Sequence, residues 1–291
     1  MDGLGLHGIH GGQKGYGGSG AGRPVMTGRP GPGGHYGESL FEPEHPQEAE
    51  RIDAAALVYD PFTTRLLHAL DPGPGSRCLE VGAGTGTVVR WLVEEAGAGE
   101  VVALDRGTGA LEALAGPRVR VISADLRDES LDLGSFDLIH ARFVLMHLPE
   151  RRQLVSRLAR WLGPGGWLVL GDAVEVRNLL DTSSAYRRTM DAMWQALKSS
   201  IGTDTSDVPA YPHLLGEEGL RNVAGELFCP PLVAGGPLAR FWSETWNRMR
   251  PALEETGQVD SAVIDAAVAY LASPRLAELG PGMVMAWGQR P

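Results

Sequence analysis

The residues Cys78-Leu79-Glu80-Val81-Gly82-Ala83-Gly84-Thr85-Gly86 decide the fold that this sequence predicts. They begin as a buried strand, pass through a glycine turn and lead into the helical pattern of residues 87–92. A glycine has no Cβ, so the backbone can turn tightly there and let a ligand approach closely. The glycines are spaced G-x-G-x-G rather than the G-x-G-x-x-G of a dinucleotide site, and Glu80 would repel a pyrophosphate. The turn therefore favours a nucleoside that carries a cationic amine.

Two more acids follow the next two predicted strands. Residues 101–105 form an apolar strand that ends in Asp105, about 20 residues beyond the turn, where a nucleoside-binding α/β fold carries its ribose-binding acid. Charge assistance strengthens the hydrogen bonds that such a carboxylate accepts from ribose hydroxyls. Residues 119–123 form a third strand. Just beyond it, Asp125 can accept from an adenine amino group and Leu126 can pack on the ring.

On these residues the chain resembles the class I S-adenosylmethionine-dependent methyltransferases of small molecules. The resemblance also covers residues 136–142, the turn 162–166 before a strand at 167–172, and the closing segment 281–288. It implies an α/β fold, a Rossmann-like doubly wound sheet of seven strands, mostly parallel with an antiparallel last strand, plus helical lid insertions. It implies S-adenosyl-L-methionine as cofactor. The implied cofactor-binding residues are Glu80, Gly82, Ala83, Gly84, Asp105, Arg106, Ala124, Asp125, Leu126, Ala141 and Arg142.

The sequence divides into four parts. Residues 1–37 are rich in glycine and poor in apolar groups, which predicts a disordered tail, or alternatively a flap that orders over the cofactor. Residues 38–70 predict two cap helices, the second starting at Asp60-Pro61 because Asp caps a helix and Pro suits its first position. Residues 71–172 predict the cofactor-binding core, in which strands alternate with helices.

The remaining residues, 173–291, predict a helical lid and the last two strands of the sheet. Helical spacing is found at residues 185–199, 238–250 and 259–271, and a further helix at 214–220 precedes a sixth strand near 223–228. The seventh strand, near 283–287, would pair antiparallel with the sixth at the sheet edge. We expect the acceptor specificity to lie in the lid.

Composition narrows the choice of partners and compartment. The net charge of −10 over 291 residues, without a Lys/Arg cluster, argues against nucleic acid as a partner. Two cysteines predict no disulfide framework, and no stretch reaches the ~20 apolar residues of a membrane span. We therefore expect a cytoplasmic protein with a small-molecule acceptor and no membrane partner; a homodimer is left open.

The sequence offers one candidate general base. His147 follows the fourth predicted strand, where the transferred methyl group should meet its acceptor, and histidine acts near neutral pH. The alternative is a structural imidazole that caps the helix starting near Pro149. No metal site is expected. The candidate substrate-binding residues are aromatic or imidazole side chains of the lid that could enclose a planar acceptor, namely Tyr186, Trp194, Tyr211, His213 and Trp242.

The predicted function is methyl transfer from S-adenosylmethionine to a small molecule, plausibly a specialised metabolite. One alternative is an enzyme of the same fold that keeps the cofactor and catalyses a cyclisation or another rearrangement. Another is a non-catalytic scaffold or regulatory partner. Product mass separates the first two readings, because only transfer adds a methylene group.

Overall fold

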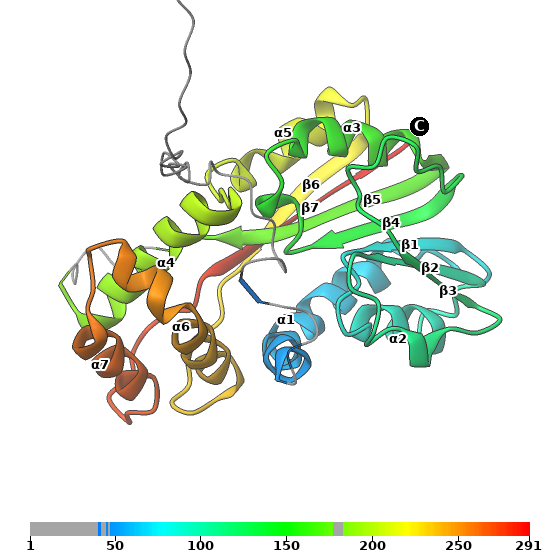
Figure 1. The fold of residues 1–291 in the computed structure, drawn as a ribbon. Coiled ribbons are helices and arrows are strands. Elements are labelled where there is room, and N and C mark those ends of the chain that lie inside the picture. Colours follow the sequence, from blue (N-terminus) through cyan, green and yellow to red (C-terminus); the bar gives the residue numbers. More distant parts are fainter. Residues whose placement is uncertain (1–39, 42–44, 46, 177–182) are drawn as a thin grey trace, which may run out of the picture. The chain divides into compact units, whose positions relative to one another are not determined.

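The computed structural model describes residues 40, 41, 45, 47–176 and 183–291 (Figure 1). The predicted tail, residues 1–37, lies outside the described residues. None of the helices in these ranges is long and apolar enough to cross a bilayer.

Within the described residues, seven strands form a single mixed sheet. They are β1 (Arg77–Val81), β2 (Glu100–Asp105), β3 (Val119–Ser123), β4 (Phe136–Arg142), β5 (Leu162–Val174), β6 (Arg221–Phe228) and β7 (Gly282–Gln289). Their order is β3-β2-β1-β4-β5-β7-β6. The strands from β3 to β5 pair in parallel, whereas β7 runs antiparallel to both β5 and β6. The predicted fold class is confirmed. The chain order reverses between β1 and β4, and ligands of such sheets bind beyond the carboxyl ends of the strands at that point.

Helices cover both faces of the sheet (Figure 1). Helices α1 (Glu48–Leu70) and α2 (Thr87–Glu94) lie on one face, and α3 (Arg151–Arg160) and α5 (Tyr211–Glu217) lie on the other. Alternate strand residues follow this division: Cys78 packs in the core under α1 and α2, while Leu79 packs in the core under α3 and α5. The buried strands are therefore apolar on both faces, as in other sheets covered by helices.

The predicted lid is a group of three long helices. They are α4 (Ala185–Ile201), α6 (Pro237–Glu255) and α7 (Ser261–Leu271), which Figure 1 shows together beyond the carboxyl ends of β4 and β5. Helix α6 continues past Pro251 to Glu255, five residues beyond the predicted end at residue 250, and buries Leu253 in the core. Helix α6 also packs against α1, so α1 and the lid enclose the same space.

The prediction of two cap helices was wrong. One helix, α1, runs through Asp60 and Pro61 without a break. A proline inside a helix removes one hydrogen bond and typically costs about 3 kcal/mol. Burial on both sides of it offsets this cost, because Tyr59 and Phe62 both pack against Phe228.

The strict alternation of strands and helices was also wrong. Between β2 and β3 the chain forms only a short 3₁₀ turn, Glu112–Leu114. Glycines at 107, 109 and 116, with Pro117, break the helical pattern there. Between β3 and β4, residues 124–135 form turns rather than a helix.

Candidate active site

The glycine turn forms the centre of the site. Gly82, Gly84 and Gly86 connect β1 to α2, and all three have positive φ values, of 67°, 56° and 79°. A Cβ added at Gly82 would overlap the side chain of Val144, which comes from the segment after β4. Glycine is required at this position both by the backbone conformation and by the close approach of the neighbouring segment.

Asp105 holds this turn in place. Its carboxylate accepts the N–H of Gly84 at 2.8 Å and the N–H of Gly107 at 3.0 Å. The same side chain faces the cavity described below. Asp105, the acid predicted at the end of β2, therefore stabilises the glycine turn. Its contact with a ribose stays a prediction.

Asp125 lies beyond β3 and is paired with arginine. Its carboxylate accepts from Arg127 Nε at 3.0 Å and from Arg127 Nη2 at 2.6 Å, and Arg106 Nε lies 3.6 Å away. The hydrogen bonds from Arg127, chiefly, lower the pKa of Asp125 to about 2. The carboxylate is therefore ionised, and can act only as a hydrogen-bond acceptor.

Glu80 is almost completely buried and pairs with a histidine that the sequence analysis did not select. Glu80 Oε2 lies 2.7 Å from Nδ1 of His140, which is 0 % exposed. The two residues are register partners on β1 and β4. A histidine within an otherwise apolar strand is the signal in the sequence that could have identified it.

A cavity of about 1220 Å³, the main cavity, opens between this edge of the sheet, α1 and the lid. A volume above the ~300–1,000 Å³ of common small-molecule pockets leaves room for two ligands. Most of the predicted site residues line it: Glu80, Gly82, Ala83, Gly84, Asp105, Arg106, Ala124, Asp125, Leu126, Arg142, His147, Trp194 and Trp242.

The lid side of the main cavity is aromatic and apolar. Trp242 and Phe241 from α6 face it, and their rings meet edge to face with centroids 4.7 Å apart. Trp194 and Met193 of α4 line it as well, as do Tyr59 of α1 and Phe143 after β4. The acidic and glycine-rich half thus faces an aromatic half.

Four predicted site residues lie elsewhere. Ala141 packs in the core on the side of α3 and α5. Tyr211 is 0 % exposed and its hydroxyl donates to Asp172, whereas His213 points outward, 3.2 Å from Glu217. Tyr186 lines a smaller cavity of about 280 Å³ that shares Trp194 with the main cavity.

Arg142 lines the main cavity at the end of β4, and its guanidinium is held by α1. Nη2 lies 2.5 Å from Asp60 Oδ1, and Nη1 donates to Thr63 Oγ1 at 2.7 Å. These contacts fix α1 against the sheet beside the glycine turn. They use part of the hydrogen-bonding capacity of the guanidinium. Arg142 also lines the main cavity, and its contact with the cofactor stays a prediction.

His147 also lines the main cavity. Its Nδ1 lies 2.8 Å from Thr203 Oγ1, at the start of the loop after α4. Burial, and then the positive charges of Arg151 and Arg51, lower its pKa to about 3. The imidazole is therefore neutral. Helix α3 begins at Arg151, and its N-cap residue is Glu150. His147 therefore does not cap this helix as predicted, and its imidazole contacts Thr203 instead.

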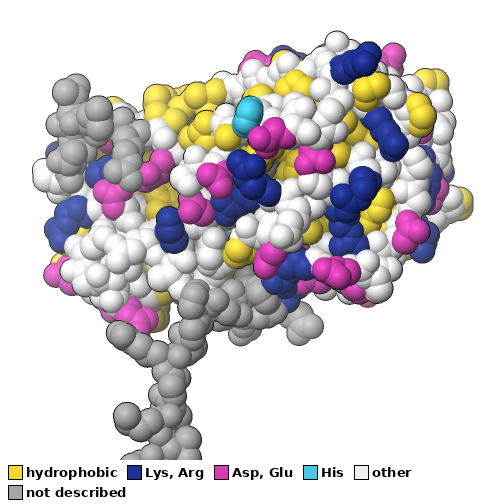
Figure 2. All heavy atoms as spheres, turned by 90° about the horizontal axis from the view of Figure 1, so that it is seen from above, with side chains coloured by type: hydrophobic (Ala, Val, Ile, Leu, Met, Phe, Trp, Pro, Cys, Tyr) yellow, Lys and Arg dark blue, Asp and Glu magenta, His cyan; other side chains and the backbone are white. Residues whose placement is uncertain are grey.

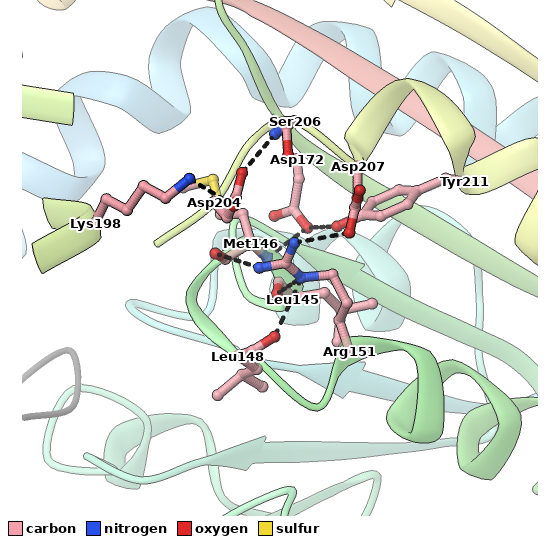
Figure 3. A network of polar contacts seen from close by, with 10 residues as sticks. All are labelled: Leu145, Met146, Leu148, Arg151, Asp172, Lys198, Asp204, Ser206, Asp207 and Tyr211. Atoms are coloured by element: carbon pink, nitrogen blue, oxygen red, sulfur yellow. Dashed lines mark hydrogen bonds and ion pairs between the residues drawn. The ribbon is translucent and has the colours of Figure 1, made fainter. Parts of the chain in front are cut away.

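A polar network supports residues 146–148, which line the main cavity, through contacts made outside it (Figure 3). Asp172 Oδ2 accepts the N–H of Met146 at 3.0 Å and the hydroxyl of Tyr211 at 2.5 Å. Arg151 donates to the carbonyls of Leu145, Leu148 and Met146 and pairs with Asp207. Burial, chiefly, raises the pKa of Asp172 to about 7. From the sequence, Asp172 was predicted only as the end of a strand. Its partners could not be predicted, because Met146 and Tyr211 lie 26 and 39 residues away in the chain.

Charged groups elsewhere are mixed in sign. Figure 2 shows the face over α3 and α5, where basic and acidic side chains alternate. Arg152 of α3 pairs there with Glu217 of α5 at 3.2 Å. In the described part of the chain, three or more His, Cys, Asp or Glu side chains nowhere gather in a group that could hold a metal ion.

Comparison with known proteins points to one family. Residues 79–170 match the methyltransferase domain. The chain is 36% identical over 180 residues to the methyltransferase GfsG of Streptomyces halstedii, an alignment that covers 58% of this chain and 61% of that protein. It is 28% identical over 182 residues to the methyltransferase str2 of Strobilurus tenacellus, covering 60% of this chain and 65% of that one. The chain thus spans less than two thirds of the length of these curated relatives.

Solved structures share the fold at low sequence identity. Phosphoethanolamine N-methyltransferase 2 of Haemonchus contortus, bound to S-adenosylhomocysteine, superposes with a TM-score of 0.54 at 17% identity, covering 84% of this chain and 58% of that one. A structure from Galdieria sulphuraria, described as a sarcosine dimethylglycine methyltransferase, superposes with a TM-score of 0.52 at 18% identity. The superposition covers 86% of this chain and 92% of that one.

Proposed function

Residues 79–170 are a methyltransferase domain set in a class I methyltransferase fold, and from this premise we propose that the chain transfers a methyl group from S-adenosylmethionine to a small-molecule acceptor. One observation carries the proposal. The glycine turn, Asp105 and Asp125 come from three successive strand ends, and all line the same cavity at the point where the strand order reverses.

The residues present fit S-adenosylmethionine. Glu80 and Asp105 offer carboxylates to the α-ammonium and ribose groups, while Asp125 and Leu126 offer an acceptor and an apolar surface for adenine. Gly82 keeps the turn free of a side chain where Val144 already approaches. When bound, the cofactor supplies a methyl group activated by a sulfonium, and its leaving group departs neutral.

The aromatic half of the cavity is the proposed acceptor site. Trp242, Phe241 and Trp194 offer broad apolar faces, which suit a ring-bearing, uncharged molecule such as a specialised metabolite. Similarity to the bacterial and fungal methyltransferases above supports this choice. We expect Trp242→Ala to weaken acceptor binding and to leave the affinity for S-adenosylhomocysteine unchanged.

This chain's main contribution to the reaction is to hold the two ligands in position. Alignment of reacting groups can supply about 7–11 kcal/mol of the barrier, and the aromatic lining excludes water. His147 is neutral and can accept a proton from the acceptor. Its lowered pKa makes it a weak base, so we assign it first to orienting the acceptor's hydroxyl or amine.

The cysteines, the surface charges and the sheet edge bear on the compartment and the partners of the protein. Cys78 and Cys229 are both free thiols, as expected in the cytoplasm. We place the enzyme there, without a nucleic-acid partner, because acidic and basic groups are mixed on the face shown in Figure 2. A homodimer could use β6, which lies at the sheet edge.

Calorimetric titration with S-adenosylmethionine, S-adenosylhomocysteine and NAD tests the cofactor. We expect micromolar binding of the first two and none of NAD. Mass spectrometry of acceptor panels should then find products that gain one methylene. A folded protein that binds neither adenosyl ligand would overturn the proposal, and a product of unchanged mass would indicate rearrangement instead.

A further inference from the structure

The buried pair of Glu80 and His140 is built across two neighbouring strands. Glu80 on β1 and His140 on β4 are register partners in a parallel ladder, and their side chains meet at 2.7 Å. Glu80 lines the main cavity, whereas His140 lies behind it and is 0 % exposed. The histidine therefore contacts the carboxylate from the protein side, and leaves the cavity side to a ligand.

The surroundings determine which ring nitrogen carries the proton. Nε2 of His140 is buried and has no hydrogen-bond partner among residues 47–176 and 183–291. An N–H at Nε2 would be left without an acceptor, which is costly in a core. A carboxylate can only accept, so the proton belongs on Nδ1, from which it is donated to Glu80.

A neutral imidazole leaves the negative charge of Glu80 in place. Across the described ranges, Glu80 forms no ion pair with a lysine or an arginine. The nearest cavity-lining arginine on the same strand as His140, Arg142, is paired with Asp60 instead. An almost buried carboxylate that faces a cavity without a cationic partner is suited to receive a cation from the ligand.

We propose that His140 is a positioning residue: its Nδ1–H fixes the Glu80 carboxylate so that the other oxygen receives the α-ammonium group of the cofactor. This inference rests on the proposed function. It goes beyond it by assigning a role in cofactor recognition to a side chain that is shielded from the cofactor.

Two ligands separate this role from a packing role. S-Adenosylhomocysteine carries the amino-acid group, whereas 5′-methylthioadenosine has the same nucleoside and lacks that group. We expect His140→Leu to weaken binding of S-adenosylhomocysteine about tenfold, the size of one charge-assisted hydrogen bond, and to change binding of methylthioadenosine less than about twofold. His140→Asn, whose amide can donate from the position of Nδ1, should restore most of the affinity.

A second variant keeps the experiment decisive if His140→Leu fails to fold. His140→Phe fills the volume of the ring without donating a hydrogen bond, and alone it should also weaken S-adenosylhomocysteine binding about tenfold. In a Glu80→Gln background the ammonium partner is already lost, so adding His140→Phe should cause no further loss of S-adenosylhomocysteine binding. Equal losses for both ligands, or an unchanged affinity for S-adenosylhomocysteine in His140→Leu, would overturn the inference. Failure of the parent protein to bind either ligand would instead overturn the proposed function, so the two failures are distinguishable.

Discussion

The hydroxyl of Tyr211 on α5 donates to Asp172 Oδ2 on β5 over 2.5 Å, and both side chains are buried. The same oxygen accepts the N–H of Met146, which lines the main cavity. One carboxylate therefore joins a strand, a helix and the cavity wall. The position of the wall depends on hydrogen bonds made outside the cavity.

Removing this hydroxyl should destabilise the protein. Tyr211→Phe leaves Asp172 with one donor fewer in a buried place, so we expect the free energy of unfolding to fall by about 1–3 kcal/mol in urea titrations. His213→Ala is the matched control on the same helix, because that side chain is 72% exposed; its change should stay within about 0.5 kcal/mol. Equal effects of the two substitutions would argue against the role of the hydroxyl.

Asp172 should make stability depend on pH. Its pKa is raised from 3.8 to about 7, so over that range the native protein keeps a proton that the unfolded chain has lost. Its contribution to stability is full below about pH 4 and is lost as the pH rises toward 7. Asp172→Asn does not titrate, and should therefore gain stability relative to the parent protein between pH 5 and pH 7, by up to about 1.4 kcal/mol per pH unit. A flat difference would contradict the raised pKa.

His147 should make stability depend on pH in the opposite direction from Asp172. Its pKa is lowered from 6.5 to about 3, so the unfolded chain binds a proton that the native protein does not. This contribution to stability is full above about pH 6.5 and is lost as the pH falls toward 3. We expect His147→Gln to gain stability relative to the parent as the pH is lowered from 6.5 to 4, measured by urea unfolding at each pH. A gain on raising the pH would refute the lowered pKa.

Asp105 should be important for cofactor binding. Asp105→Ala removes the predicted ribose acceptor and the partner of the Gly84 N–H, so we expect the affinity for S-adenosylhomocysteine to fall by roughly 1.5–3 kcal/mol in calorimetry. Asp265→Ala, at an exposed carboxylate that pairs with Arg250, should leave that affinity unchanged. An unaltered affinity in Asp105→Ala would contradict the assignment of Asp105 as a cofactor-binding residue.

The glycine turn can be tested through its contact with Val144. Gly82→Ala adds a Cβ that overlaps Val144 and also meets a positive φ, so both stability and cofactor affinity should fall. Gly97→Ala is the control for φ alone, because φ there is 72° and the space is open; it should cost about 1–2 kcal/mol of stability and no affinity. Adding Val144→Ala to Gly82→Ala should recover part of the affinity.

The strand ends could be predicted because the information is local. Residues 119–123 and 136–142 were predicted as strands with the bounds of β3 and β4, and the acids at 105 and 125 were placed from spacing alone. Each depends on an apolar run and the turn beside it, which lie within a few residues of each other. The confirmed fold class rests on these strands.

The lid could not be predicted to the same depth. Tyr211 and Trp242 looked alike in sequence, as aromatic residues of helical or loop segments, yet Trp242 lines the cavity and Tyr211 binds Asp172. Which aromatic side chain faces the cavity depends on how α4, α6 and α1 pack, and that is decided between residues far apart in the chain. Pro61 shows the same limit, because the local signal for the start of a second helix was overridden by packing of Phe62 against Phe228.

The place of β7 in the sheet leaves β6 without a strand partner during part of synthesis. Strand β6 is made first, yet in the described part of the chain its neighbour in the sheet is β7 alone, which follows after α6 and α7. On the ribosome, both edges of β6 are therefore unpaired until Gly282–Gln289 has emerged, and unpaired strand edges are prone to join other chains. The nascent chain should thus depend most on chaperones while residues 229–281, between β6 and β7, are being translated.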